Sequence, residues 1–121
     1  MEPKRLFEGE LRFLSVIWEH EPVPSGELVR LCEAELGWKK STTYTMLKRM
    51  AEKGLVKNER TTVTSLVSRA EVQAAESQCV VEQSFAGSLP GFLVAFLGGK
   101  TISDEEAEAI KRLIDEHREN P

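Results

Sequence analysis

Apolar residues in the first part of the chain recur at the spacing of a helix. Between residues 10 and 21 they lie three or four positions apart, which predicts one helix with a buried stripe of Leu11, Leu14, Ile17 and Trp18. Pro22 and Pro24 end that helix because proline cannot continue it. A second helix is expected over residues 26–36, with Ser25 as its N-cap and Gly37 in the left-handed position just after it.

The next segment predicts a third helix and then a hairpin. The helix covers residues 42–53, with Ser41 as its N-cap and Gly54 after its end. Its inner stripe is Thr43, Leu47 (or Met46) and Met50. Imperfect alternation in the following residues predicts two short antiparallel strands. We place these strands at residues 55–60 and 63–68, with Thr61 and Thr62 in the turn.

Three further helices are predicted in the second half, each with a recognisable start. Ser68 and Glu71 form a capping box, S-x-x-E, which opens a helix that runs to about residue 86. Ser88 and Pro90 suit the cap and first turn of a short apolar helix, GFLVAFL. A second capping box, Ser103 and Glu106, opens the last helix, whose apolar stripe is Ala107, Ile110, Leu113 and Ile114.

Three helices, a hairpin and then more helices is the order of a winged helix-turn-helix followed by a helical region. The predicted fold class is therefore mainly α with a small β-hairpin wing. At 121 residues the chain has room for one or two small domains. We place the boundary near residue 69, which gives a winged-helix domain of residues 1–68 and a helical dimerisation domain of residues 69–121.

The C-terminal region holds more large apolar side chains than so short a segment can bury against itself. Such a surplus favours a partner surface, and the simplest partner is a second copy of the chain. The alternative is that these residues pack back onto the first domain. The residues expected in a dimer interface are Phe85, Leu89, Phe92, Leu93, Phe96, Leu97, Ile110, Leu113 and Ile114.

Charge is distributed unevenly along a chain whose net charge is −4. Residues 38–60 carry seven basic and two acidic side chains, a net charge of +5, whereas residues 6–37 and 68–121 each carry −5. A positive block within an acidic chain is a candidate anion-binding face. The same pattern is also typical of a solvated helix surface that binds nothing.

The outward face of the third helix carries side chains suited to DNA. Hydroxyl groups gather at its N-terminal end and cations follow one turn later; hydroxyls contact phosphates or base edges, and arginine pairs with guanine. We expect the backbone of the DNA to be held by Lys39, Lys40, Lys48 and Arg49. Ser41 lies at the helix start, and the bases would be read by Thr42, Tyr44 and Thr45.

The stretch STTYTMLKRMAEKGLV (41–56) resembles the recognition helix of the penicillinase-repressor family, which typically shows Thr-apolar-x-Thr-Leu-Leu-x-Arg-Leu-x-x-Lys-Gly. The matching residues are Thr42, Thr45, Leu47, Arg49, Lys53 and Gly54. Residues 11–28, including Trp18, and residues 102–117 resemble the family's first and last helices, so the resemblance covers nearly the whole chain. It implies a homodimeric transcriptional repressor that binds an operator dyad in double-stranded DNA and is interlocked by its C-terminal helices.

The chain departs from the family pattern in three places. Thr43 stands where an apolar residue is usual. The predicted wing, ERTTVTSLVS, has neither a Gly-Arg tip nor aromatic residues, so only Arg60 is carried over as a DNA contact. Copper-responsive members end in a cysteine-rich metal motif, and this chain has no cysteine after Cys79, so the resemblance implies no copper sensing by that route.

In antibiotic-responsive members of the family, a membrane-bound metalloprotease sensor leads to cleavage within the short apolar helix. The matching bond here is Ala95–Phe96, although those members have Asn at the position of Ala95. The resemblance therefore implies a membrane-bound sensor protease as a further partner. The simpler interpretation of Phe96 is a residue of the dimer core.

The sequence predicts no catalytic, metal or cofactor site. The only good soft metal ligands are His20, His117, Cys32 and Cys79, and no two have a ligand spacing such as C-x-x-C or H-x-x-x-H. No P-loop, G-x-S-x-G or H-E-x-x-H motif is present, so we expect no enzyme. No apolar run approaches the roughly 20 residues of a membrane span, and no secretory signal is visible, so we expect a cytoplasmic protein with reduced thiols.

Two alternatives stay open. Trp38 either covers the edge of the second and third helices or lies near the DNA backbone. The whole chain is either a DNA-binding repressor or a winged-helix module that binds another protein, which its acidic flanks would suit. Salt separates the two functions, because binding through several phosphates loses on the order of 10³-fold in affinity between 50 and 200 mM salt.

Overall fold

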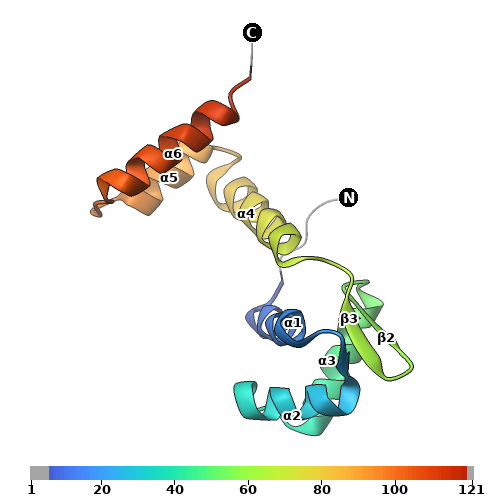
Figure 1. Cartoon of the computed structure of the whole chain (residues 1–121). Coiled ribbons are helices and arrows are strands. Elements are labelled where there is room, and N and C mark those ends of the chain that lie inside the picture. Colours follow the sequence, from blue (N-terminus) through green and yellow to red (C-terminus); the bar gives the residue numbers. More distant parts are fainter. Residues whose placement is uncertain (1–5, 120–121) are drawn as a thin grey trace.

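The structure is a computed structural model that describes residues 6–119. Over these residues the elements are α1 (Glu8–His20), β1 (Val23–Pro24), α2 (Ser25–Leu36), α3 (Lys40–Glu52), β2 (Val56–Glu59), β3 (Thr62–Ser65), α4 (Arg69–Phe85), α5 (Leu89–Leu97) and α6 (Asp104–Glu116). The first three helices and the sheet gather at one end, and α4 leads from them toward α5 and α6 (Figure 1). The predicted fold class is confirmed: a mainly helical chain with a small sheet after the third helix.

The hydrophobic core lies among α1, α2, α3 and the sheet. The predicted stripe of α1 is partly wrong, because Leu11 is exposed while Phe13 and Val16 are buried beside Leu14 and Ile17. The helix is covered on two sides, by α2 and α3 and by β3. Its buried face is therefore wider than a single stripe, and the sequence pattern alone did not show which edge would be covered.

Both predicted N-caps in this part of the chain are wrong. α2 begins at Ser25 itself, because Pro24 is still paired in the sheet and the Ser25 N–H donates to the carbonyl of Thr61 at 2.8 Å. α3 begins at Lys40, the residue before Ser41, and its N-cap is Lys39. The extended backbone of Lys39 turns its carbonyl toward the helix, where it accepts from the Thr43 N–H at 3.1 Å.

The hairpin is part of a three-stranded antiparallel sheet in the order β1-β3-β2. The sequence did not predict β1, since two residues are too few to show an alternating pattern; in the structure Val23 pairs with Val63. The turn is one residue earlier than expected. Arg60 and Thr61 occupy it with φ of 52° and 62°, the left-handed backbone that a two-residue hairpin loop requires.

Serine caps define the C-terminal helices as predicted. The Ser68 hydroxyl accepts from the Glu71 N–H at 3.0 Å, and the Ser68 N–H donates to the Glu71 carboxylate, so the first capping box is confirmed. Ser88 accepts from the Gly91 N–H at 2.9 Å. Ser103 likewise accepts from the backbone N–H of residue 106 at 3.1 Å, which is one half of the second predicted box.

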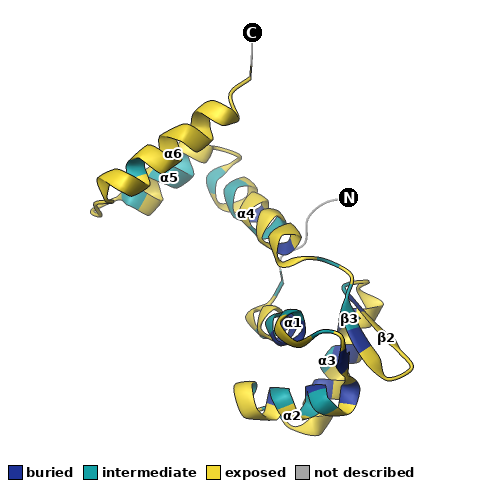
Figure 2. Cartoon of the chain, viewed as in Figure 1, coloured by how far each residue is buried: buried dark blue, intermediate teal, exposed yellow. Residues whose placement is uncertain are grey.

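Burial divides the chain sharply. Buried residues concentrate in the winged-helix end, whereas α5 and α6 are exposed or half-buried along their length (Figure 2). In α4 the buried residues are Val72 and Cys79. Among residues 6–119 no single helix has the length and apolar composition to cross a membrane. α4 and α5 have that length and composition only when they are taken together, and this pair is bent by 89°.

Candidate nucleic-acid interface

The orientation of α3 determines which side chains are available to a partner. Thr43, Leu47 and Met50 are buried, so the predicted inner stripe is confirmed. That leaves the opposite face of the helix to solvent. Every residue that the sequence assigned to DNA contact on this helix is exposed: Lys40, Ser41, Thr42, Tyr44, Thr45, Lys48 and Arg49, together with Lys39 at the N-cap.

Thr43 fits the core despite its polar side chain. Its hydroxyl donates to the backbone carbonyl of Lys39 at 3.4 Å, one turn earlier, so the buried oxygen is satisfied. The neighbouring Cys32 is fully buried. Burial raises the pKa of the Cys32 thiol, the Thr43 hydroxyl acts in the opposite direction, and the charge of Glu35 raises it further. The thiol therefore stays protonated and behaves as a small apolar group.

An open hollow of about 220 Å³ lies on the outward side of α3, lined by Ser41, Thr42, Thr45, Met46 and Arg49. Four of these residues belong to the predicted DNA-contact set. Met46 does not; the sequence offered it only as an alternative to Leu47 in the inner stripe. In the structure Met46 is half-buried, packs against the core and also lines the hollow. Its position directly after the outward-facing Thr45 was the signal in the sequence for this intermediate placement.

The cations of the positive block divide into two groups. Within residues 6–119, Lys39, Lys40, Lys48 and Arg49 form no ion pair. Lys53 instead pairs with Glu10 at 2.5 Å and Lys57 with Glu59 at 3.1 Å. The charge count alone therefore overstated the free positive charge, and the unpaired cations are concentrated at α3.

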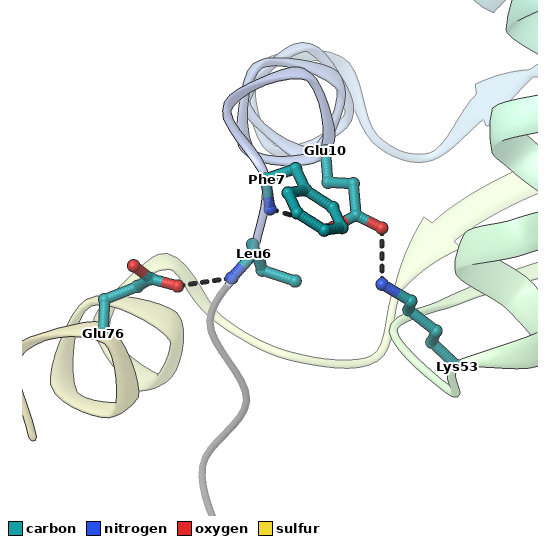
Figure 3. Close-up of polar contacts among 5 residues, drawn as sticks. All are labelled: Leu6, Phe7, Glu10, Lys53 and Glu76. Atoms are coloured by element: carbon teal, nitrogen blue, oxygen red, sulfur yellow. Dashed lines mark hydrogen bonds and ion pairs between the residues drawn. The ribbon is translucent and has the colours of Figure 1, made fainter. Parts of the chain in front are cut away.

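A buried carboxylate fixes the C-terminal end of α3. Glu10 is almost fully buried in α1 and accepts from Lys53 Nζ and, at 3.0 Å, from the backbone N–H of Phe7 (Figure 3). Burial acts to raise the pKa of Glu10, but these two hydrogen bonds and the charges of Lys53 and Arg49 outweigh it and hold that pKa below its usual value. The sequence pattern did not identify Glu10 as an important residue. A buried glutamate is recognised only when its partner, here Lys53, is known.

The wing is tied to α1 and carries one cation at its tip. Glu21, just after α1, accepts from the Ser65 N–H at 2.8 Å and from the Ser65 hydroxyl at 2.9 Å. Arg60 is exposed in the turn between β2 and β3, whereas the sequence placed it at the end of the first strand of the hairpin. The wing is therefore held at its base by Glu21, and its tip keeps the Arg60 side chain exposed to solvent.

Trp38 packs against the core. Its ring stacks on Phe13 with centroids 5.8 Å apart and an interplanar angle of 14°, and the side chain is half-buried. This contact supports the packing interpretation over a position at the DNA backbone.

The nine residues expected in a dimer interface all lie on α4, α5 or α6, and in the single chain none of them is buried. The ring centroid of Phe92 lies 5.5 Å from that of Phe85 and 5.9 Å from that of Phe96, so α4 and α5 share an aromatic cluster. Large apolar groups remain open to solvent, namely Leu89, Phe96, Ile110, Leu113 and Ile114. None of the nine residues belongs to the hydrophobic core of the winged-helix end or packs against it, which argues against the alternative to dimerisation.

Acidic residues and a histidine meet at one place on the surface. Glu19, His20 and Glu35 bring one potential ligand atom each to within 4.8 Å of one another, and His20 Nε2 lies 3.4 Å from a Glu35 oxygen. All three residues are exposed, and their contacts are those of an ordinary surface ion pair between α1 and α2. We assign no metal to them.

Comparison with known proteins places this arrangement in a family. A sequence profile described as Penicillinase repressor matches residues 7–116. The penicillinase repressor of Bacillus licheniformis is 22% identical to this chain over 118 residues, which span 94% of this chain and 92% of that protein.

Proposed function

The chain belongs to the penicillinase-repressor family of DNA-binding transcriptional regulators, which are not enzymes, and from that premise we propose that it binds an operator dyad as a homodimer. In this proposal α3 lies in the major groove of each half-site. Lys39, Lys40, Lys48 and Arg49 hold the phosphates, and Ser41 adds a hydroxyl contact at the helix start. Thr42, Tyr44 and Thr45 read the base edges, and Arg60 adds a contact from the wing.

The observation that carries the proposal is the segregation of side chains on α3. One face of the helix is locked in the core by Thr43, Leu47 and Met50, and the opposite face exposes hydroxyls and four cations without ion-pair partners among residues 6–119. A cation that is already paired in the protein gains little from a phosphate. Unpaired cations beside hydroxyl groups are suited to a polyanion with readable base edges.

The dimer is supported by what the single chain leaves uncovered. α5 and α6 have no buried residue, although α5 is almost entirely apolar. Helices of nine and thirteen residues are marginal by themselves, because most helical stability in proteins comes from packing. A second copy would cover both helices at once, and it would join two winged-helix ends in the symmetric arrangement that a dyad operator needs. The division into domains of residues 1–68 and 69–121 is part of this proposal.

Release from DNA would follow from loss of the dimer. Ala95 and Phe96 lie inside α5 and are exposed in the single chain. Because α5 is one of the helices that the proposed dimer covers, a cut of the Ala95–Phe96 bond by a protease from a membrane-bound sensor would remove part of the dimer interface. Intact mass of the protein after exposure to induced membranes of the source organism tests this route. An uncut chain that still leaves its operator would mean that another signal releases it.

The experiment that tests the function is selection of genomic DNA fragments by the purified full chain at about 150 mM salt. We expect recovery of a few fragments that carry an inverted repeat, and an affinity that falls on the order of 10³-fold between 50 and 200 mM salt. Recovery of random DNA, or of none, would contradict the proposal. A binding partner held with little salt dependence would instead favour the protein-interaction module.

A further inference from the structure

The first half of α4 is docked on the winged-helix end through one face. The Arg69 guanidinium lies 4.9 Å from the centre of the Trp18 ring, and Val72 is buried in the shared core. One turn further along, Glu76 accepts a hydrogen bond from the backbone N–H of Leu6 at 2.6 Å. Positions 69, 72 and 76 lie on one side of a helix, so the three contacts act together.

The segment that leads into α4 is fixed as well. Trp18 Nε1–H donates to the carbonyl of Val67 at 2.9 Å, and the Ser68 capping box sets the first turn of the helix. Trp18 therefore holds Val67, two residues before α4, and through its ring it contacts Arg69, the first residue of α4. We call Trp18, Arg69, Val72 and Glu76 the α4 clamp.

The same contacts are linked to α3. Leu6, which holds Glu76, is followed by Phe7, whose N–H donates to the Glu10 carboxylate that binds Lys53 at the C-cap of α3 (Figure 3). The base of α4 and the end of α3 are thus attached to neighbouring residues at the start of α1. The orientation of α4 relative to α3 therefore depends on two contacts of this segment: the hydrogen bond from Leu6 to Glu76, and the hydrogen bonds of the buried Glu10 carboxylate with Phe7 and Lys53.

Among the described residues, none of α4 after Val72 and none of α5 or α6 belongs to the core cluster of the winged-helix end, and α5 and α6 bury no residue. α4 turns into α5 at 89°. The direction in which the C-terminal helices leave the winged helix is therefore decided at the base of α4.

We infer that the α4 clamp makes the protein selective for the spacing between operator half-sites. This inference rests on the proposed function, a dimer on an operator dyad. Half-sites one helical turn apart are about 34 Å and 10–10.5 base pairs from centre to centre, so each added base pair moves the second site by roughly 3.4 Å and rotates it by roughly 34°. An arm clamped at its base cannot follow that change, whereas a hinged arm can.

Avidity sets the size of the effect. Two linked binding events exceed either single affinity by 10²–10⁴-fold, and this gain is lost when the geometry forbids simultaneous binding. We therefore expect the full chain to bind a preferred spacing at least tenfold more tightly than the same half-sites moved by two base pairs. The probe is a set of duplexes made from the best repeat selected out of random DNA, with zero, one or two base pairs inserted or removed at the centre.

The variant Arg69→Ala/Glu76→Ala removes two clamp contacts without changing the net charge. We expect it to flatten the spacing preference to less than threefold while its affinity for a duplex with one half-site stays at the wild-type value. Trp18→Phe, which keeps a ring and loses only the Nε1–H donor, should lie in between. Arg12→Ala/Glu19→Ala, a charge-matched pair on the exposed side of α1, should behave as wild type.

Two results would overturn the inference: a wild-type protein that tolerates all spacings, or a clamp variant that remains as selective as wild type. The single half-site duplex separates this from the function itself. A wild-type chain that binds neither one half-site nor any repeat would overturn the proposed function, and the inference with it. A chain that binds a dyad without spacing preference would overturn the inference alone.

Discussion

Two residues at the tip of the wing adopt a backbone that their side chains disfavour. Arg60 and Thr61 both have positive φ, and Thr61 is β-branched, so its side chain crowds the backbone in the left-handed region. The turn persists because both flanking strands are paired and because the Thr61 carbonyl accepts from the Ser25 N–H. The backbone conformation of the turn therefore lowers the stability of the fold locally, and the surrounding hydrogen bonds maintain it.

Replacement of Thr61 by glycine should relieve that cost. We expect Thr61→Gly to stabilise the protein by about 1 kcal/mol, because glycine reaches positive φ without a steric penalty and keeps the carbonyl bond to Ser25. Thermal unfolding would measure the gain. Thr62→Gly is the matched control: Thr62 begins β3, where glycine should destabilise by roughly 0.5–1 kcal/mol. A loss of stability in both variants would contradict the assignment of strain to Thr61.

Glu10 is the second residue whose environment makes a measurable prediction. Its pKa in the folded protein lies below 4.5, the ordinary value for a glutamate. The ionised carboxylate therefore stabilises the fold fully at pH values above the pKa that this glutamate has in the unfolded chain. The contribution is lost as the pH falls through the pKa of Glu10 in the folded protein.

Glu10→Gln should cost about 2 kcal/mol at neutral pH, since it replaces a hydrogen bond between two charged groups by a weaker one from Lys53 to a neutral amide oxygen. The difference between wild type and variant should shrink as the pH falls below 4.5, the ordinary pKa of a glutamate, and disappear once the pH is below the lower pKa of folded Glu10. Urea unfolding across this range measures both effects. Glu8→Gln, an exposed change in the first turn of α1, serves as control, and an equal cost for both variants would argue against the buried pair.

At the scale of elements, α3 is a helix whose stability comes from its inner face and whose outer face is free for recognition. Thr43, Leu47 and Met50 hold it in the core, and the Lys53–Glu10 bond fixes its end. Substitutions on the outward face should therefore change binding with little effect on folding. The outward cations and hydroxyls differ in what they would contact, so they make different predictions.

Lys39→Ala should weaken binding to all DNA sequences alike and reduce the salt slope by about one, as expected for one lost phosphate contact. Thr45→Ala should instead change the preference between sequences, with about 1–3 kcal/mol of lost discrimination at one base pair. Fluorescence anisotropy over a salt series separates the two. Lys111→Ala, on α6, should leave both quantities unchanged, and an unchanged slope for Lys39→Ala would remove Lys39 from the interface.

At the scale of the whole molecule, the chain joins a well-packed end to an end that a single copy does not complete. The core cluster lies in the winged helix and reaches only the start of α4. Large apolar side chains on α5 and α6 stay open to solvent (Figure 2). The two ends should therefore respond differently to a charge placed on an exposed leucine.

Leu113→Glu should dissociate the proposed dimer, because it would bury an unpaired carboxylate in the interface. Leu66→Glu is a closely matched control: Leu66 is 54% exposed and Leu113 is 55% exposed in the single chain, but Leu66 lies at the wing. Sedimentation velocity should show a monomer for the first variant and a dimer for the second. Dyad affinity should fall on the order of 10²-fold only for the first, and equal behaviour of the two variants would contradict a dimer through α6.

The sequence by itself determined the features that depend on neighbours along the chain. Helical spacing located six helices, serine and glutamate three residues apart set the start of α4, and glycine after α2 and α3 marked their ends at positive φ. The inner stripe of α3, and with it the outward set from Ser41 to Arg49, also followed from spacing. These signals are local, so each was readable without the rest of the fold.

Only the tertiary structure decided what depends on residues far apart in the sequence. The strand β1 exists because β3 is there to pair with it, and Ser25 begins α2 because Thr61 accepts its N–H. Burial of Glu10 beside Lys53, and the hold of Trp18 and Leu6 on α4, join positions more than forty residues apart. No periodicity encodes such pairs, because a contact across the fold depends on how the helices pack and not on the spacing within any one of them.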